Sequence, residues 1–352
     1  MIILLFCEKL MIKLDKKDRL ILYYLIHNSR QSLKTIGKKV GISKESTHYR
    51  IKRLVKKEII RNFTLFVNFR SFGYSAMMTH YKFININPNI KEEIINFFVN
   101  NKYTFYVSLI EGKYDFQVDF LLGDPHKFEA LLDEIREKYY QYLLFQSSKF
   151  YIRGEFFNFA FLLDEKNYKK DFFQWEWGSN LADIDDLDFK ILKELSKDSR
   201  NPTKNIANNI NSSVTTVNSR IKKMEKIFRA ENFKKGEYSI YTINVDWAKI
   251  GYRWFHLQIN LRDYSKKKDI ILYLRQNPYL IRSFKFLNID TDLHFTFLLH
   301  NMEHLRDIID DITTKFPDLI NDYHFYSTYK IFKHIFLVPE LIKMRNPLNR
   351  EY

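Results

Sequence analysis

The chain has 352 residues, more than one hydrophobic core usually serves, so two or more domains are expected. Lys and Arg number 57 against 42 Asp and Glu, and the net charge of +15 favours a polyanionic partner such as nucleic acid. The single cysteine, Cys7, excludes an intrachain disulfide and a thiolate metal site, and no stretch approaches the ~18 uncharged apolar residues that span a bilayer, so a cytoplasmic protein is expected.

The chain contains an internal repeat. A shift of 170 residues places residues 14–63 on residues 184–233 without a gap, and farther along the shift becomes 178 and then 177. The matched pairs include Leu14-Asp15 with Ile184-Asp185, Ser29-Arg30 with Ser199-Arg200, Arg50-Ile51-Lys52 with Arg220-Ile221-Lys222, Phe72-Gly73-Tyr74 with Ile250-Gly251-Tyr252, and Asp115 with Asp292. Each copy has a helical part and a mixed part. The expected domains are 14–65 and 66–165 in the first copy and 184–237 and 238–340 in the second, with tails at 1–13 and 341–352 and a linker at 166–183.

Residues 14–65 predict three helices. Asp15 and Asp18 have the spacing that caps the start of a first helix. A short second helix ends at Gly41, a residue suited to the left-handed turn after a helix, and Ser43 can cap a third helix that runs to about Lys57. Two helices joined by a tight turn of this kind are typical of a helix-turn-helix, whose second helix lies in the DNA major groove.

The third helix has two chemically different faces. Thr47, Ile51, Leu54 and Val55 are expected to pack inward. The residues expected to contact DNA are Ser43, Glu45, Ser46, Tyr49, Arg50, Lys52, Arg53, Lys56 and Lys57. Arg50 and Arg53 are expected to grip guanine or phosphate in two-pronged contacts, and the lysines to attract phosphate. A charge run also fits a solvated helix face. However, residues 14–63 hold 14 basic and 4 acidic residues, and this concentration favours DNA contact.

The second copy repeats the three predicted helices with a smaller excess of basic residues. Residues 184–233 hold 10 basic and 7 acidic residues, Pro202-Thr203 begin the second helix, and Asn211 replaces the turn glycine. Its third helix, from Val214, offers Thr215, Thr216, Ser219, Arg220, Lys222 and Lys223 to DNA. Two readings stay open, since this copy either contacts DNA as a weaker partner or only supports the fold.

The second part of each copy predicts the order strand, helix, strand, strand, helix, strand of a ferredoxin-like sandwich. In the first copy the elements are expected at residues 79–86, 90–100, 104–110, 115–122, 126–139 and 145–153. The second copy follows the same order from Trp254 to Tyr329, with helices near 266–276 and 302–316. The fold class is therefore α+β, with two tandem units that each join a winged-type helix-turn-helix to a βαββαβ sandwich.

Six short motifs follow one another along the first copy: Leu14-Asp15-x-x-Asp18, Asn28-Ser29-Arg30, Gly41-Ile42-Ser43, Arg50-Ile51-Lys52-Arg53-Leu54, Phe72-Gly73-Tyr74 and Glu111-Gly112-x-x-Asp115. In this order they resemble the Lrp/AsnC family of feast/famine transcriptional regulators, in a tandem form seen in some archaeal members. The resemblance implies binding to double-stranded DNA, dimerisation through the sheets, possible homo-oligomers, and an amino-acid effector near Gly112 and Asp115. In the second copy Ile289 or Asp290 fills the glycine position, and only Asp292 persists. A second reading is that Gly112 makes a tight turn and Asp115 caps it.

No catalytic constellation, cofactor loop or metal-ligand pair is recognisable in the sequence, so a regulator without cofactor or metal is expected rather than an enzyme. His80, His256, His294 and His300 lie on or near expected strands, where histidines are more often packed or exposed than catalytic. Two alternatives stay open: a fused enzyme like the sirohaem decarboxylases, which resemble the same two-part fold, and a co-regulator that pairs with other family members. The preferred mechanism is an internal pseudo-dimer that places two different third helices on successive major grooves.

Overall fold

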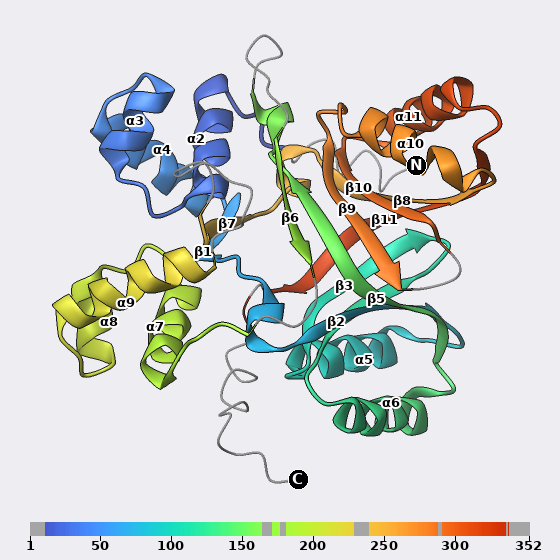
Figure 1. Cartoon of the computed structure of the whole chain (residues 1–352), viewed down its shortest axis with the longest axis horizontal. Coiled ribbons are helices and arrows are strands. Elements are labelled where there is room, and N and C mark those ends of the chain that lie inside the picture. The colour runs from blue at the N-terminus through green and yellow to red at the C-terminus, as the bar shows by residue number, and fades with distance from the viewer. Residues whose placement is uncertain are drawn as a thin grey trace. The chain divides into compact units, whose positions relative to one another are not determined.

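The computed structural model describes residues 11–163, 171–176, 181–228, 239–287, 291–335 and 337 (Figure 1). These residues form two compact units. Unit 1 draws on Met1–Val67, Phe157–Phe173 and Asp183–Arg253, and unit 2 on Asn68–Phe156, Gln174–Ala182 and Trp254–Tyr352. Each unit therefore combines corresponding parts of both copies of the repeat.

Unit 1 contains the two predicted helix-turn-helix segments. The first consists of α2 (Lys16–His27), α3 (Leu33–Val40) and α4 (Lys44–Lys56), and the second of α7 (Asp186–Lys197), α8 (Thr203–Asn209) and α9 (Val214–Ile227). Asp15 and Asp185 cap the first helix of each set, as predicted. Gly41 and Asn211 both adopt the left-handed conformation, with φ of 71° and 53°, which confirms the predicted equivalence of these turn residues.

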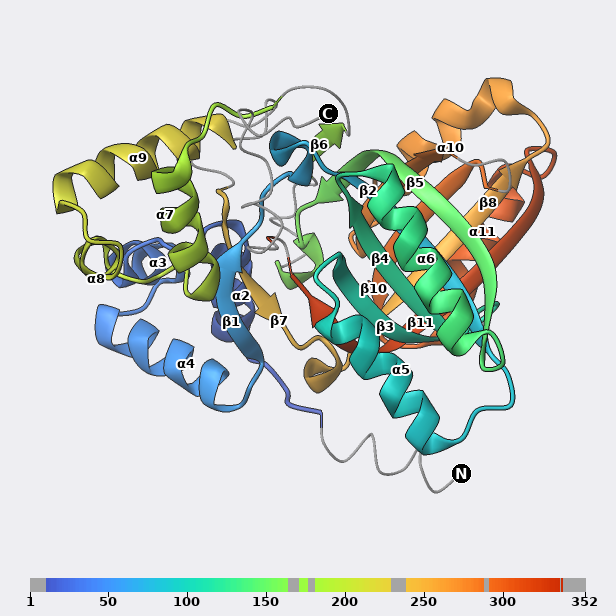
Figure 2. The same cartoon turned by 90° about the horizontal axis from the view of Figure 1, so that it is seen from below.

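A two-stranded antiparallel sheet joins the helical sets and was not among the predicted elements. It consists of β1 (Ile60–Leu65) and β7 (Tyr241–Val245), with Phe63 opposite Ile243. Figures 1 and 2 both show these strands between the two sets of helices. Each strand is short and finds its partner in the other copy, so neither leaves a local pattern that reveals the pairing.

Unit 2 contains two βαββαβ halves in the predicted order. The first consists of β2 (Ser75–Phe83), α5 (Pro88–Asn100), β3 (Thr104–Gly112), β4 (Phe116–Leu122), α6 (Pro125–Tyr139) and β5 (Leu143–Phe157). The second consists of β8 (Arg253–Leu261), α10 (Lys267–Leu274), β9 (Leu280–Leu287), β10 (Leu293–Leu299), α11 (Met302–Lys315) and β11 (Ile320–His334). Short 3-10 turns lie at Phe69–Phe72 and Tyr264–Lys266 in unit 2, and at Ala160–Leu162 and Ala248–Ile250 in unit 1.

The strands of the two halves form one closed ring. The hydrogen-bonded order is β2-β4-β3-β11-β8-β10-β9-β5, and β5 also pairs with β2. The halves meet twice, where β3 pairs with β11 and where β5 pairs with β9. A further strand, β6 (Phe172–Glu176), adds to β5. Because β6 lies within residues 166–183, that stretch is not only the connector that the sequence predicts.

The outer face of the ring is apolar and packs against helices. In β4, Phe116, Val118 and Phe120 alternate toward a core shared with Ile94 and Phe98 of α5. Figure 2 shows α5 and α6 running along this side of the first half. Because these large side chains are buried on one face, apolar and polar residues alternate along the strands of the sequence.

The inner face of the ring carries buried polar side chains. His80 stacks on Tyr114 at a ring distance of 4.2 Å, and His256 stacks on Tyr326 at 4.4 Å. His294 lies 3.4 Å from His256, measured from Nε2 to Nδ1. Burial lowers the pKa of all three histidines, that of His256 to about 3, so they are neutral near pH 7.

Asp119 is the buried acid of this inner face. Gln117 and Tyr151 each donate a hydrogen bond of 2.9 Å to its carboxylate. Burial nevertheless raises the pKa of Asp119 to about 7. The folded chain therefore binds this proton more tightly than the unfolded chain does, and the contribution of Asp119 to stability falls as the pH rises from about 4 to 7.

We expect Asp119→Asn to remove this pH dependence. Between pH 4 and 7 the wild type should lose about 4 kcal/mol of unfolding free energy relative to the variant. Above pH 7 the difference between the two proteins should stay constant. Urea unfolding of both proteins at several pH values measures it. A difference that does not change with pH would contradict the raised pKa.

Candidate nucleic-acid interface

The turn before α4 brings two helices into close contact. A Cβ atom at Gly37 of α3 would lie 2.7 Å from the carbonyl oxygen of Ile42 and 2.8 Å from Oγ1 of Thr47, so only glycine fits there. Ser43 caps α4 by accepting a hydrogen bond of 3.1 Å from the amide of Ser46. These contacts fix the direction in which α4 leaves the turn.

The inward face of α4 is largely as predicted. Thr47, Ile51 and Leu54 are buried. The prediction for Val55 is wrong, since this side chain is 39% exposed. The helix ends at Lys56, Glu58 takes a left-handed φ of 54°, and the fully buried Ile59 occupies the inward place after Leu54.

Arg50 and Arg53 anchor α4 to α2 rather than lying on the open face. Arg50 Nη1 donates to Asp15 Oδ2 at 2.7 Å and to Asp18 Oδ1 at 2.9 Å, and Arg53 Nη2 donates to Asp18 Oδ2 at 2.5 Å. The hydrogen bond to Asp15 raises the pKa of the Arg50 guanidinium. The side chain of Asp18 is 3% exposed, so the carboxylate depends on these two partners. Both arginines therefore have intramolecular partners, and their expected two-pronged contacts with guanine or phosphate stay a prediction.

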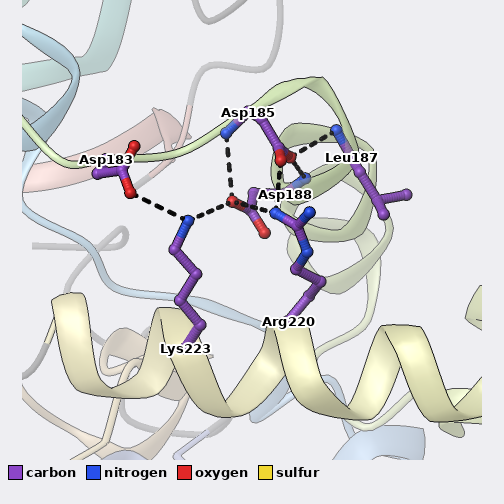
Figure 3. A network of polar contacts seen from close by, with 6 residues as sticks. All are labelled: Asp183, Asp185, Leu187, Asp188, Arg220 and Lys223. Atoms are coloured by element: carbon purple, nitrogen blue, oxygen red, sulfur yellow. Dashed lines mark hydrogen bonds and ion pairs between the residues drawn. The ribbon is translucent and has the colours of Figure 1, made fainter.

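The second copy repeats this anchor, as Figure 3 shows. Arg220 Nη1 lies 2.5 Å from Asp185 Oδ2 and 3.2 Å from Asp188 Oδ2. Lys223 Nζ lies 3.3 Å from Asp188 Oδ2 and 3.5 Å from Asp183 Oδ2. Asp188 is fully buried, as Asp18 nearly is. Arg220 and Lys223, both expected at the DNA, thus have the same intramolecular role as Arg50 and Arg53.

The remaining outward side chains form an open face on each third helix. On α4 and its two caps, the exposed residues are Ser43, Lys44, Glu45, His48, Tyr49, Lys52, Val55, Lys56 and Lys57. On α9, they are Val214, Thr215, Asn218, Ser219, Lys222, Glu225 and Lys226. The predicted residues Ser46 and Thr216 are half-buried beside the caps. The hydroxyl groups of Thr216 and Ser213 are hydrogen-bonded at 2.8 Å. Sequence reasoning missed Lys44, His48, Val214, Asn218 and Lys226, although their spacing from the named residues places them on the same face.

The two helical sets also meet through a reciprocal contact. The hydroxyls of Ser29 and Ser199 lie 2.6 Å apart. Arg30 donates to the carbonyl of Ser199 at 2.6 Å, and Arg200 donates to the carbonyl of Ser29 at 2.5 Å. A contact in which residue i of one copy meets residue j of the other, and the reverse, is that of a two-fold dimer. The Ser-Arg pair recurs at the shift of 170, and this recurrence is the sequence pattern that indicates the contact.

Gly112 and Asp115 both have structural partners in unit 2. A Cβ atom at Gly112, whose φ is 122°, would lie 2.9 Å from the carbonyl of Phe325 in the adjacent β11. Asp115 accepts a hydrogen bond of 3.0 Å from the amide of Phe83, and Asp292 accepts one of 2.8 Å from Leu261. The aspartate that persists in both copies therefore fixes the same turn twice, while the effector role of Gly112 and Asp115 stays a prediction. Ile289 and Asp290 lie outside the described residues.

The described part of the chain contains no cluster of three or more His, Cys, Asp or Glu side chains that could hold a metal ion. None of its helices is long and apolar enough to cross a membrane.

Comparison with known proteins agrees with this geometry. A family model described as winged helix-turn-helix DNA-binding matches residues 14–61 and 184–227. An uncharacterized HTH-type transcriptional regulator of Pyrococcus horikoshii is 30% identical over 128 residues, which make up 35% of this chain and 84% of the relative. The HTH-type transcriptional regulator LrpA of the same organism is 37% identical over 64 residues, 18% of this chain and 45% of LrpA.

A solved structure shares the tandem architecture. The crystal structure of the sirohaem decarboxylase NirDL aligns with 94% of this chain and 97% of its own, with a TM-score of 0.59 and 11% sequence identity. This likeness concerns the fold. The two winged helix-turn-helix segments define a DNA-binding protein. The chain belongs to the Lrp/AsnC family of HTH-type transcriptional regulators.

The anchor on Asp18 predicts a stability effect. Asp18→Ala removes the shared partner of Arg50 and Arg53, and we expect unfolding free energy to fall by about 1–3 kcal/mol. The matched control is Lys52→Ala on the open face, which should change stability by less than about 0.5 kcal/mol. Thermal or urea unfolding of the full chain compares them. Equal effects of the two substitutions would show that the anchor does not stabilise the fold.

Proposed function

We propose that one chain binds one operator as an internal pseudo-dimer, with α4 and α9 in successive major grooves about 10 base pairs apart. The observation that carries this proposal is the reciprocal contact of Ser29-Arg30 with Ser199-Arg200, together with the pairing of β1 and β7. These contacts relate the two helix-turn-helix segments as the two subunits of a dimeric regulator are related.

The open face of α4 supports DNA contact by its charge. Lys44, Lys52, Lys56 and Lys57 are exposed, and only Glu45 opposes them among the exposed residues of the helix and its cap. Lysine side chains on such a face neutralise phosphates without reading bases. The open face of α9 has two lysines, Lys222 and Lys226, beside Glu225, which supports a weaker but real contribution of this copy.

Lys52→Ala and Lys56→Ala should each weaken DNA binding by similar factors on all sequences. Each should also reduce the slope of log affinity against log salt by about 1, because one phosphate contact is lost. Fluorescence anisotropy at several salt concentrations measures both quantities. The control is Lys268→Ala, which removes the same charge from an exposed site on α10 in unit 2 and should leave the slope unchanged. Equal slopes for all three variants and the wild type would exclude this face.

The internal pseudo-dimer also predicts stoichiometry and spacing. Titration should saturate at one chain per operator, and an insertion of about 5 base pairs between the half-sites should reduce affinity by about tenfold or more, because it rotates one half-site to the opposite side of the duplex. If two chains are required on each operator, each contributing one helix, the internal pairing is wrong.

The family resemblance extends the proposal to a small effector such as an amino acid near Gly112 and Asp115, and to assembly of several chains. Calorimetric titration with amino acids and sedimentation of the full chain test these two expectations. Neither is needed for the operator contact described above.

A second candidate function is decarboxylation of sirohaem. The fold likeness to NirDL and the buried histidines of the ring favour it. We propose a regulator rather than an enzyme, because the concentration of exposed lysines on α4 favours a polyanionic partner. Absorbance spectra after addition of sirohaem, with product analysis, distinguish the two functions; turnover of sirohaem would overturn the non-enzymatic proposal.

A further inference from the structure

The two third helices are exposed and buried in the same pattern. From Gly41 to Lys56 and from Asn211 to Lys226, each residue of one copy has the same degree of burial as its counterpart 170 positions away. The fold therefore presents the same positions to DNA in both copies. Differences in what the two helices read must come from the residue types at these positions.

The exposed positions divide into a shared and a divergent group. Lys52 and Lys56 are matched by Lys222 and Lys226. Near the end of the helix Val55 is replaced by Glu225, which accepts a hydrogen bond of 2.9 Å from Tyr241. In the first two turns, by contrast, all four exposed positions differ. They pair Lys44 with Val214, Glu45 with Thr215, His48 with Asn218, and Tyr49 with Ser219. The N-terminal turns of a recognition helix are those that reach base edges, whereas lysines farther along position the helix on phosphates.

The divergent side chains are available for recognition. Within the described residues none of the eight forms a hydrogen bond or an ion pair, whereas Arg50 and Arg220 at their side are held by aspartates. Tyr49 is 67% exposed and Val214 is 42% exposed. The eight divergent side chains can therefore reach base edges without the loss of an intramolecular ion pair, whereas the arginines cannot.

Resting on the proposed function, we infer that the operator is asymmetric in base type, with G·C pairs under α4 and A·T pairs under α9. Lys44 and His48 offer donors to the guanine acceptors O6 and N7, and Glu45 accepts from the cytosine amino group. Asn218 matches adenine N6 and N7 in a bidentate pair, and Val214 offers methyl groups to the thymine methyl. Tyr49, Thr215 and Ser219 pair with either kind and add no preference.

The inference is tested by selecting bound DNA from a random pool with the full chain. The wild type should enrich a site with one G·C-containing and one A·T-rich half. A variant with Lys44→Val, Glu45→Thr, His48→Asn and Tyr49→Ser should enrich a symmetric site of two A·T-rich halves. All four positions are exposed, and unchanged thermal unfolding of the variant confirms that it folds.

A single substitution locates the contact. Asn218→Ala should lower affinity for the selected site by about tenfold and relax preference at one A·T pair only, whereas Lys222→Ala should weaken binding to all sequences alike. Enrichment of no DNA at all by the wild type would reject the proposed function. Enrichment of a site whose halves have equal composition, or an unchanged site for the quadruple variant, would reject this inference alone.

Discussion

The structure depends on the need of strand edges for hydrogen-bonding partners. A single βαββαβ half leaves two edge strands, and the backbone groups of such edges are satisfied only by another strand. Here β3 pairs with β11 and β5 with β9, so each half completes the other and the ring has no open edge among its eight strands. The same constraint operates in unit 1, where β1 pairs with β7 of the other copy. The tandem repeat supplies both partners in one chain.

Much of this architecture could be predicted from the sequence, because it depends on local chemistry. Asp15, Ser43 and Asp185 predict helix starts, because their own side chains accept the capping hydrogen bonds. Gly41 and Asn211 predict the turns, because both residue types tolerate the left-handed conformation. The βαββαβ order follows from apolar alternation within each element. The features that could not be predicted depend on partners distant in the chain. They are the pairing of β1 with β7, the pairing of β6 with β5, and the ion pairs of Arg50. A helical wheel places Arg50 on a polar face, but it does not show that Asp18 of another helix lies against that face.

The anchors change what the net charge means. The first helix-turn-helix segment is far more basic than the second, yet Arg50 and Arg53, like Arg220 and Lys223, are partly neutralised by buried aspartates in both copies. The anchors therefore contribute equally to the charge of the two copies. Part of the remaining difference lies on the open faces, where Lys44 and Lys57 are replaced by Val214 and Ile227, and part lies on the other helices, where Lys16 is replaced by Asp186. Charge at an anchor serves packing, and charge on an open face serves recognition.

Covalent fusion of the two halves changes how operator occupancy responds to expression level. A regulator made of separate subunits dissociates when dilute, so its occupancy rises with a power of concentration greater than one. In this chain the ring and the paired serines join halves that are already tethered, and their effective concentration does not depend on the amount of protein in the cell. If one chain occupies one operator, as proposed above, occupancy follows expression hyperbolically and without a threshold. The tether also lets each half accumulate its own substitutions, which subunits encoded by one gene cannot do.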